Sequence, residues 1–131
     1  MSRKIFLTLI ACIALAVGTF ALVGPSALLD GKGATATLAT NVMTREVGVL
    51  LLSVGLLTFL VRSHRDSPTL KAILIANGSL QMAIFPIEIA AHVQGTFAKL
   101  SGIAPNSVFH VIAASGFIYF ATRIKHAPPA A

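Results

Sequence analysis

Apolar residues fill four long stretches of this chain, and short polar or Gly- and Pro-containing segments separate them. A bilayer core of about 30 Å requires about 20 helical residues, because an α-helix rises about 1.5 Å per residue. The stretches predict membrane-spanning helices at about 5–29, 42–61, 68–93 and 107–122. Short connections predict that consecutive helices run antiparallel. We therefore expect an all-α fold in which residues 1–131 form one integral membrane four-helix bundle.

The composition agrees with a membrane protein. Hydrophobic residues make up 56% of the chain and charged residues only 11%, whereas soluble proteins carry about 25% charged residues. A water-soluble domain of this size could not bury so much apolar surface. The net charge of +6 does not predict nucleic-acid binding, because the basic residues form no stripe and no aromatic-interleaved patch. We expect a multi-pass protein of the inner (cytoplasmic) membrane, with membrane lipids as its surroundings.

The basic residues are distributed unevenly between the two ends of the expected bundle. One end would hold Arg3, Lys4, Arg62, Arg65, Lys71, Arg123 and Lys125, and the other would hold Lys32, Arg45 and Lys99. Cytoplasmic segments of membrane proteins are enriched in Lys and Arg. This asymmetry predicts that both termini and the 62–67 loop are cytoplasmic.

The first stretch also has features of a signal peptide. Residues 2–4 would form its charged region, and cleavage would follow Ala21; the residues ahead of Cys12 even resemble a lipoprotein cleavage box. However, the apolar run continues well past Cys12, and cleavage would leave three helices with termini on opposite sides. We expect this stretch to be retained as a membrane span.

The third stretch carries a polar face. At 100° per residue, four polar side chains lie within one sixth of the helix circumference. They are Asn77, Gln81, Glu88 and His92. Such side chains are costly in lipid, so they should face the other helices. In the expected orientation Glu88 and His92 lie near the outer leaflet, and Arg45, Asn106 and His110 should lie in the same layer. The sequence thus predicts a polar cluster of Arg45, Asn77, Gln81, Glu88, His92 and His110.

Three interpretations of this cluster are open. Glu88 could pair with Arg45 or His110 and fix the helix register, because buried ions are tolerated only when they are paired. Alternatively, the cluster could bind the polar head of a lipid, a sterol-like molecule or a quinone. A metal or haem site is disfavoured, because Glu88 and His92 have E-x3-H spacing rather than the E-x-x-H of di-iron bundles. We predict no bound metal and no obligatory cofactor.

Motifs of common enzyme classes are missing from the sequence. There is no H-E-x-x-H, G-x-S-x-G, P-loop or redox C-x-x-C motif. Cys12 is the single cysteine, so it cannot form an internal disulfide. We assign no catalytic residue and favour a protein without catalytic activity of its own.

Several short motifs resemble the small four-span membrane proteins related to DoxX. The segments "ALVGPSALLD" and "NVMTREVGVLLLSVGLLTFL" are followed by a basic turn and a Glu-bearing third span. The family's proline after the first span and its Arg and Gly-rich second span would correspond here to Pro25, Arg45, Gly48 and Gly55. The resemblance implies a four-helix inner-membrane fold. Some DoxX relatives look like subunits of quinone-linked oxidoreductases, but no catalytic residue carries over.

Two functions follow from these observations. The first is an accessory or scaffold subunit that packs against a larger membrane complex or forms a homo-oligomer, since the chain is small and lacks enzyme motifs. The second is a binder of a lipid or quinone headgroup through Arg45, Glu88, His92 and His110.

Overall fold

The computed structural model describes residues 1–125, which contain helices and connecting segments but no strand. The helices are α1 (Arg3–Val23), α2 (Pro25–Lys32), α3 (Leu38–Val61), α4 (Pro68–Val93) and α5 (Leu100–Thr122). All except the eight-residue α2 are long and apolar enough to cross a membrane. The prediction of an all-helical chain with four candidate membrane spans is therefore confirmed.

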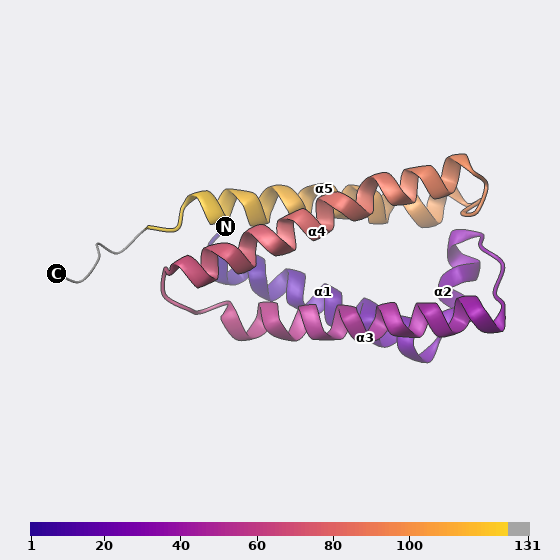
Figure 1. Ribbon diagram of the computed structural model, residues 1–131, viewed down its shortest axis with the longest axis horizontal. Coiled ribbons are helices and arrows are strands. Elements are labelled where there is room, and N and C mark those ends of the chain that lie inside the picture. Colours follow the sequence, from indigo (N-terminus) through magenta and orange to yellow (C-terminus); the bar gives the residue numbers. More distant parts are fainter. Residues whose placement is uncertain (126–131) are drawn as a thin grey trace.

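The expected first span, 5–29, is wrong at its C-terminal end. α1 ends at Val23 because Gly24 leaves the helical conformation, with φ −128° and ψ 51°. Pro25 then begins α2 at its first position, where the missing N–H costs nothing. Figure 1 shows α2 turning across the end of the molecule instead of extending α1. Residues 25–29 are thus part of a separate helix.

The other helices differ less from the predicted spans. α4 begins and ends at the expected residues 68 and 93. α3 begins at Leu38, earlier than expected, because Thr37 and Thr40 form a reciprocal capping box. α5 begins at Leu100 and continues through Pro105. Residues 100–106 were predicted to belong to a connection, because Gly and Pro usually interrupt helices.

The long helices lie in two pairs, α1 with α3 and α4 with α5 (Figure 1). Glycine allows the closest approach within the first pair. A methyl group on Gly48 would lie 2.8 Å from the carbonyl oxygen of Gly18, and one on Gly18 would lie 2.9 Å from that of Gly48. Small residues at such crossings let helix backbones come together in lipid. This contact fixes α1 against α3 near their middle.

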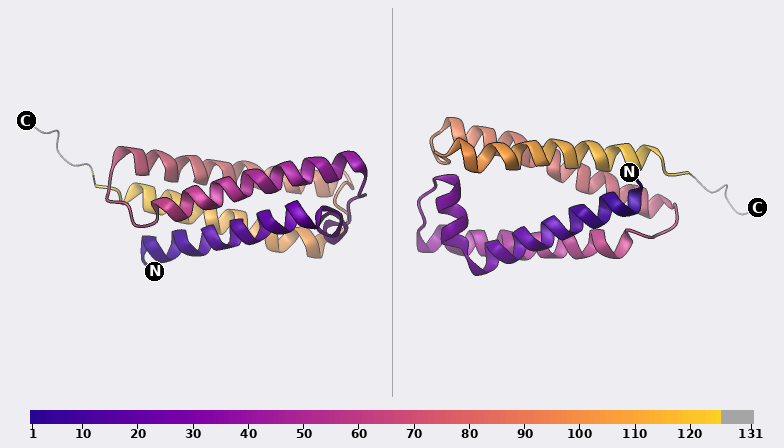
Figure 2. Two further views of the ribbon diagram at one scale, coloured as in Figure 1. Left: turned by 90° about the horizontal axis from the view of Figure 1, so that it is seen from below. Right: turned by 180° about the vertical axis from the view of Figure 1, so that it is seen from behind.

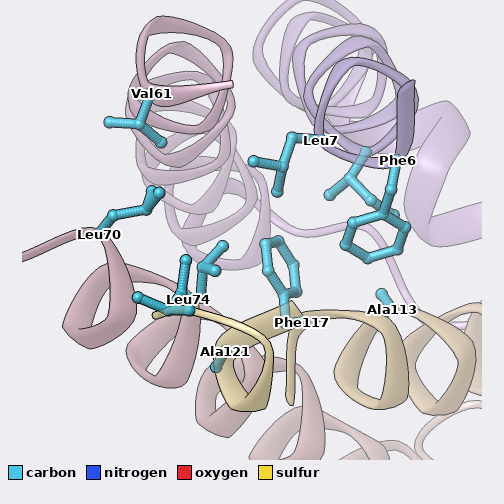
Figure 3. Packing of buried hydrophobic residues seen from close by; sticks show 10 residues of the cluster. Phe6, Leu7, Val61, Leu70, Leu74, Ala113, Phe117 and Ala121 are labelled. Carbon is cyan, nitrogen blue, oxygen red and sulfur yellow. The ribbon is translucent and has the colours of Figure 1, made fainter. Parts of the chain in front are cut away.

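A hydrophobic core joins the two pairs near the start of α1. Phe6 and Leu7 of α1 meet Leu74 of α4 and Phe117 of α5, and all four are buried (Figure 3). The rings of Phe6 and Phe117 pack edge to face with centroids 5.3 Å apart, a favourable aromatic geometry. At the opposite end of the molecule, α2 contacts α5. The pairs therefore meet at the end that holds the start of α1 and diverge toward the other end, where α2 lies between them (Figure 2).

Asp66 links three segments at the end that carries the core. Its carboxylate accepts hydrogen bonds from the Arg3 guanidinium and from the backbone N–H of Lys125. Arg3 also donates to the carbonyl oxygen of His64, 2.8 Å away. The start of α1, the α3–α4 loop and the residues after α5 thus lie together, as the grouping of basic residues predicted. The side of the membrane that this end faces stays a prediction.

Asp66 should make stability depend on pH in the acid range. The hydrogen bond from Arg3, followed by that from Lys125, lowers the pKa of the Asp66 carboxyl below its ordinary 3.8. A group with a lowered pKa stabilises the fold above its unfolded pKa, and the contribution disappears as the pH falls through the folded value. We expect Asp66→Asn to cause a small loss of thermal stability at about pH 7 and a smaller one at about pH 2.

Thermal melts in mild detergent at both pH values measure this effect. Asp30→Asn is the matched control, since the side chain of Asp30 makes no hydrogen bond to the described residues. An equal loss at both pH values would contradict an electrostatic role for Asp66.

Candidate functional site

Glu88, on α4, is the centre of a buried polar network. Its side chain is only 4% exposed. Oε1 accepts hydrogen bonds from Lys32 Nζ at 2.7 Å and Asn106 Nδ2 at 2.6 Å, and Oε2 accepts one from Ser107 Oγ at 3.0 Å. The donors come from α2 and α5, so three helices converge on this carboxylate. One cation and two further hydrogen-bond donors therefore compensate the charge of this buried carboxylate.

The network continues from Glu88 into the interior through Asn106 and His110. Nδ2 of Asn106 also donates to Nε2 of His110 at 3.0 Å, and Nδ1 of His110 lies 2.5 Å from Oε1 of Gln81. An amide nitrogen can only donate, so Nε2 of His110 is the acceptor. Nδ1 therefore carries the hydrogen and donates it in the hydrogen bond to Oε1 of Gln81. The donor and the acceptor of each of these hydrogen bonds are therefore fixed, and the imidazole of His110 is held in one tautomer. We call Lys32, Gln81, Glu88, Asn106, Ser107 and His110 the polar network.

The polar face predicted for the third span is only partly confirmed. Gln81 and Glu88 are buried and meet His110 of α5, as expected. Asn77 is also buried, one helical turn from Gln81. His92 lies outside the network: its Nδ1 is 2.7 Å from the carbonyl oxygen of Phe97, so it closes the α4–α5 connection instead.

Of the two partners predicted for Glu88, Arg45 is wrong, whereas Nε2 of His110 lies 3.9 Å from Oε2 of Glu88. Arg45 is exposed, and its Nε donates to the carbonyl oxygen of Leu22 at 3.3 Å. It lies on α3, which packs mainly against α1. The cation beside Glu88 is Lys32. With the first helix expected to continue past Gly24 to residue 29, Lys32 was predicted to lie in a connection, although Pro25 after a glycine is a signal for a new helix.

Contacts at the end of α2 hold Lys32 in place. Lys99 donates its backbone N–H to the carbonyl oxygen of Lys32 at 3.1 Å and its Nζ to that of Asp30 at 2.8 Å. Nζ of Lys32 also lies 5.0 Å from the ring centroid of Phe97, within the range of a cation–π contact. The backbones of Gly31 and Gly102 approach so closely that a methyl group on Gly102 would overlap the Gly31 carbonyl. α2 is thus fixed against the α4–α5 pair.

A cavity of about 410 Å³ lies between the two helix pairs. Lys32, Gln81, Glu88 and Asn106 line its polar side. Apolar side chains line the rest, including Val17 of α1, Leu51 of α3 and Phe109 of α5. Its volume is within the range of small-molecule sites, about 300–1,000 Å³, and such sites combine apolar walls with a few polar groups. The cavity is therefore amphipathic, with its polar groups gathered at one side.

No protein-family model, curated protein or solved structure matches this chain. The resemblance to DoxX-related proteins stays a prediction, and the chemistry of the site must be argued from its own residues. Among residues 1–125, no three His, Cys, Asp or Glu side chains lie close enough together to bind one metal ion.

The cavity offers both donors and acceptors to a bound molecule. The positive charge of Lys32 and the negative charge of Glu88 offset each other at 2.7 Å. An ammonium group has three hydrogens, and Gln81 and Asn106 each carry an amide with a carbonyl and an NH₂. The polar side therefore has little net charge but can make several hydrogen bonds. This chemistry suits an uncharged head group that contains carbonyl or hydroxyl groups.

Proposed function

We propose that this protein is a multi-pass membrane protein that binds the polar head of a small lipid- or quinone-like molecule in the cavity between its two helix pairs. The observation that carries the proposal is the cavity itself, in which Lys32, Gln81, Glu88 and Asn106 face an otherwise apolar space. Ionisable residues inside membrane helices are expensive and usually functional. A purely structural ion pair would need no adjoining space of this size.

The proposed placement is an antiparallel bundle in the inner membrane with both ends cytoplasmic. Four apolar helices support the membrane location. The basic end, where Arg3, Asp66 and Lys125 meet, supports a cytoplasmic position for that end. Glu88 and Lys32 belong to the opposite end of the molecule, so the head group would bind near the outer leaflet.

The arrangement of the network favours binding over catalysis. Ser107, His110 and Glu88 are the residue types of a hydrolytic triad. However, a nucleophilic serine donates its proton to a histidine that acts as base, whereas Ser107 Oγ donates to Glu88. His110 instead contacts Asn106 and Gln81. Ser107 is therefore not activated by His110.

Replacement of Glu88 should release the bound molecule. Glu88→Gln removes the charge that holds Lys32 and Asn106 at the polar side of the cavity. Hydrogen bonds to charged groups contribute about 1.5–3 kcal/mol, so the affinity for the molecule should fall at least about tenfold and the occupancy with it. Glu46→Gln is the matched control, because Glu46 is an exposed carboxylate on α3 outside the cavity.

Native mass spectrometry after gentle extraction from the protein's own membranes measures occupancy. We expect the 13.6 kDa chain, or a small multiple, with one added small molecule per chain that is lost in Glu88→Gln and kept in Glu46→Gln. Equal occupancy in both variants would contradict the proposal. Co-purifying protein chains without a small molecule would instead support the accessory-subunit hypothesis.

A further inference from the structure

We infer that the ligand is a single-chain amphiphile whose tail leaves the cavity sideways, between α1 and α5, and lies in a groove on the outside of these two helices. The inference rests on the proposed function, since it assumes that the polar network binds the head. Beyond the proposed function, the inference specifies the shape of the ligand and its route of entry. The ligand enters laterally from the surrounding lipid.

A second apolar space adjoins the cavity. A groove of about 540 Å³ follows the outer side of α1 and α5. It shares three lining residues with the cavity, namely Ile10, Ile13 and Phe109. These three side chains are all that the two spaces have in common, so they form the partition between them.

Side chains, and not backbones, close this partition. Seen from behind in Figure 2, α1 and α5 meet near the start of α1 and then diverge toward α2. Ile13 retains 40% of its exposed surface, and Phe109 is partly buried. Ile10, the third residue of the partition, is buried. A chain that passes between the helices would therefore displace the side chains of Ile13 and Phe109.

Two of the other sides of the cavity are closed by contacts between helices. The backbone contact between Gly18 and Gly48 closes the side between α1 and α3. The hydrogen bond from Ser107 to Glu88 and that between His110 and Gln81 join α4 to α5. A smaller space of about 210 Å³ beside α2 shares Leu28, Lys32 and Val47 with the cavity. It has less than half the volume of the groove, so it has less room for a chain.

The length of the groove fits one extended chain. It continues from Phe109 to Phe120 along α5, a rise of about 16 Å at 1.5 Å per residue. The groove therefore leads away from the polar network toward the opposite end of the helices, parallel to lipid chains. One groove accommodates one chain, so we infer a single-chain amphiphile and not a two-chain phospholipid.

Photoreactive probes locate the head and the tail separately. The full-length protein is placed in phosphatidylcholine vesicles with monoacylglycerol that carries a diazirine either beside the head or at the end of its acyl chain. We expect the first probe to label residues around Ile84 and Phe109, which line the cavity. We expect the second to label α5 at 115–120 and α1 near Leu9, which line the groove.

A pair of serine variants tests the route. Ser115 is exposed and lines the groove, so Ser115→Trp should reduce labelling by the tail probe at least about fivefold. Ser79 is exposed on α4 and lines a different groove, which shares no residue with the cavity. Ser79→Trp should leave both labelling patterns unchanged. Competition by an unlabelled alkylquinone or fatty alcohol then distinguishes a carbonyl head from a hydroxyl head.

Failure of the inference and failure of the proposed function give different results. If the head probe labels the cavity in a Glu88-dependent way but the tail probe labels α3 and α4 as strongly as α1 and α5, the route is wrong and the binding site stands. If labelling by the head probe is unaffected by Glu88→Gln, the binding site is wrong as well. Both results come from the labelling patterns of the wild-type protein and the Glu88→Gln variant, so they remain decisive if Ser115→Trp fails to fold.

Discussion

Replacing Lys32 with alanine should destabilise the protein by about 3 kcal/mol, because removal of one partner from a buried ion pair leaves the other charge uncompensated. Glu88 is 4% exposed and would keep its charge in an apolar surrounding, or would have to take up a proton. Lys32 is 20% exposed, and a lysine can extend its charged group toward water. Glu88→Ala should therefore cost less than Lys32→Ala.

The double variant distinguishes a true pair from two independent sites. Lys32→Ala with Glu88→Ala should lose less stability than the sum of the single variants, since the double variant leaves no lone buried charge behind. Arg45→Ala combined with Glu88→Ala should be additive within about 0.5 kcal/mol, because Arg45 is exposed and bonds to Leu22. Equilibrium unfolding in mixed micelles measures all these variants. Coupling between Arg45 and Glu88, or additivity between Lys32 and Glu88, would contradict the structure.

Gly102→Ala should separate α2 from α5. The new methyl group would lie 2.1 Å from the carbonyl oxygen of Gly31, and a backbone atom cannot move aside as a side-chain tip can. Such overpacking costs about 1–3 kcal/mol. Because Lys32 follows Gly31 directly, the shift should also pull its ammonium group away from Glu88 and lower ligand occupancy.

Gly31→Ala is the matched control for this variant. A methyl group on Gly31 meets no atom within 4 Å, and alanine is favoured over glycine in a helix by about 1 kcal/mol. Gly31→Ala should therefore be neutral or stabilising, with unchanged occupancy. Thermal melts and native mass spectra of both variants provide the measurement. Equal behaviour of the two variants would show that the α2–α5 contact does not position Lys32.

The local pattern of the sequence predicted the long helices and part of the site. Long apolar runs require a membrane span wherever they fold, so four spanning candidates could be found without tertiary information. The polar face of α4 followed from helical periodicity, which brought Gln81 and Glu88 onto one side. His110 was predicted to lie in the same layer, and it contacts Gln81.

The partner of Glu88 could not be found in the same way. Apolar composition continues from Val23 into the residues of α2, so hydropathy gave no sign of the break at Gly24. The position of Lys32 also depends on the approach of Gly31 to Gly102, residues far apart in the chain. Arg45 was expected at the same depth in the membrane as Glu88. A shared depth does not show which helices pack against each other.

The cavity depends still more on tertiary structure. It exists because Phe6 and Phe117 join the helix pairs at one end while α2 holds them apart at the other. None of these features follows from the periodicity of a single helix. The sequence predicted Gln81 and Glu88 of the polar side, and only the arrangement of the helices gives Lys32 and the space beside these residues.

The most direct test is a high-resolution structure of the protein purified from its own membranes into lipid nanodiscs. The account predicts density for one molecule in the cavity between the helix pairs, with polar atoms within hydrogen-bonding distance of Gln81, Asn106 or Lys32. Helix pairs that pack against each other and leave no cavity would contradict it, as would a cavity that contains only ordered water.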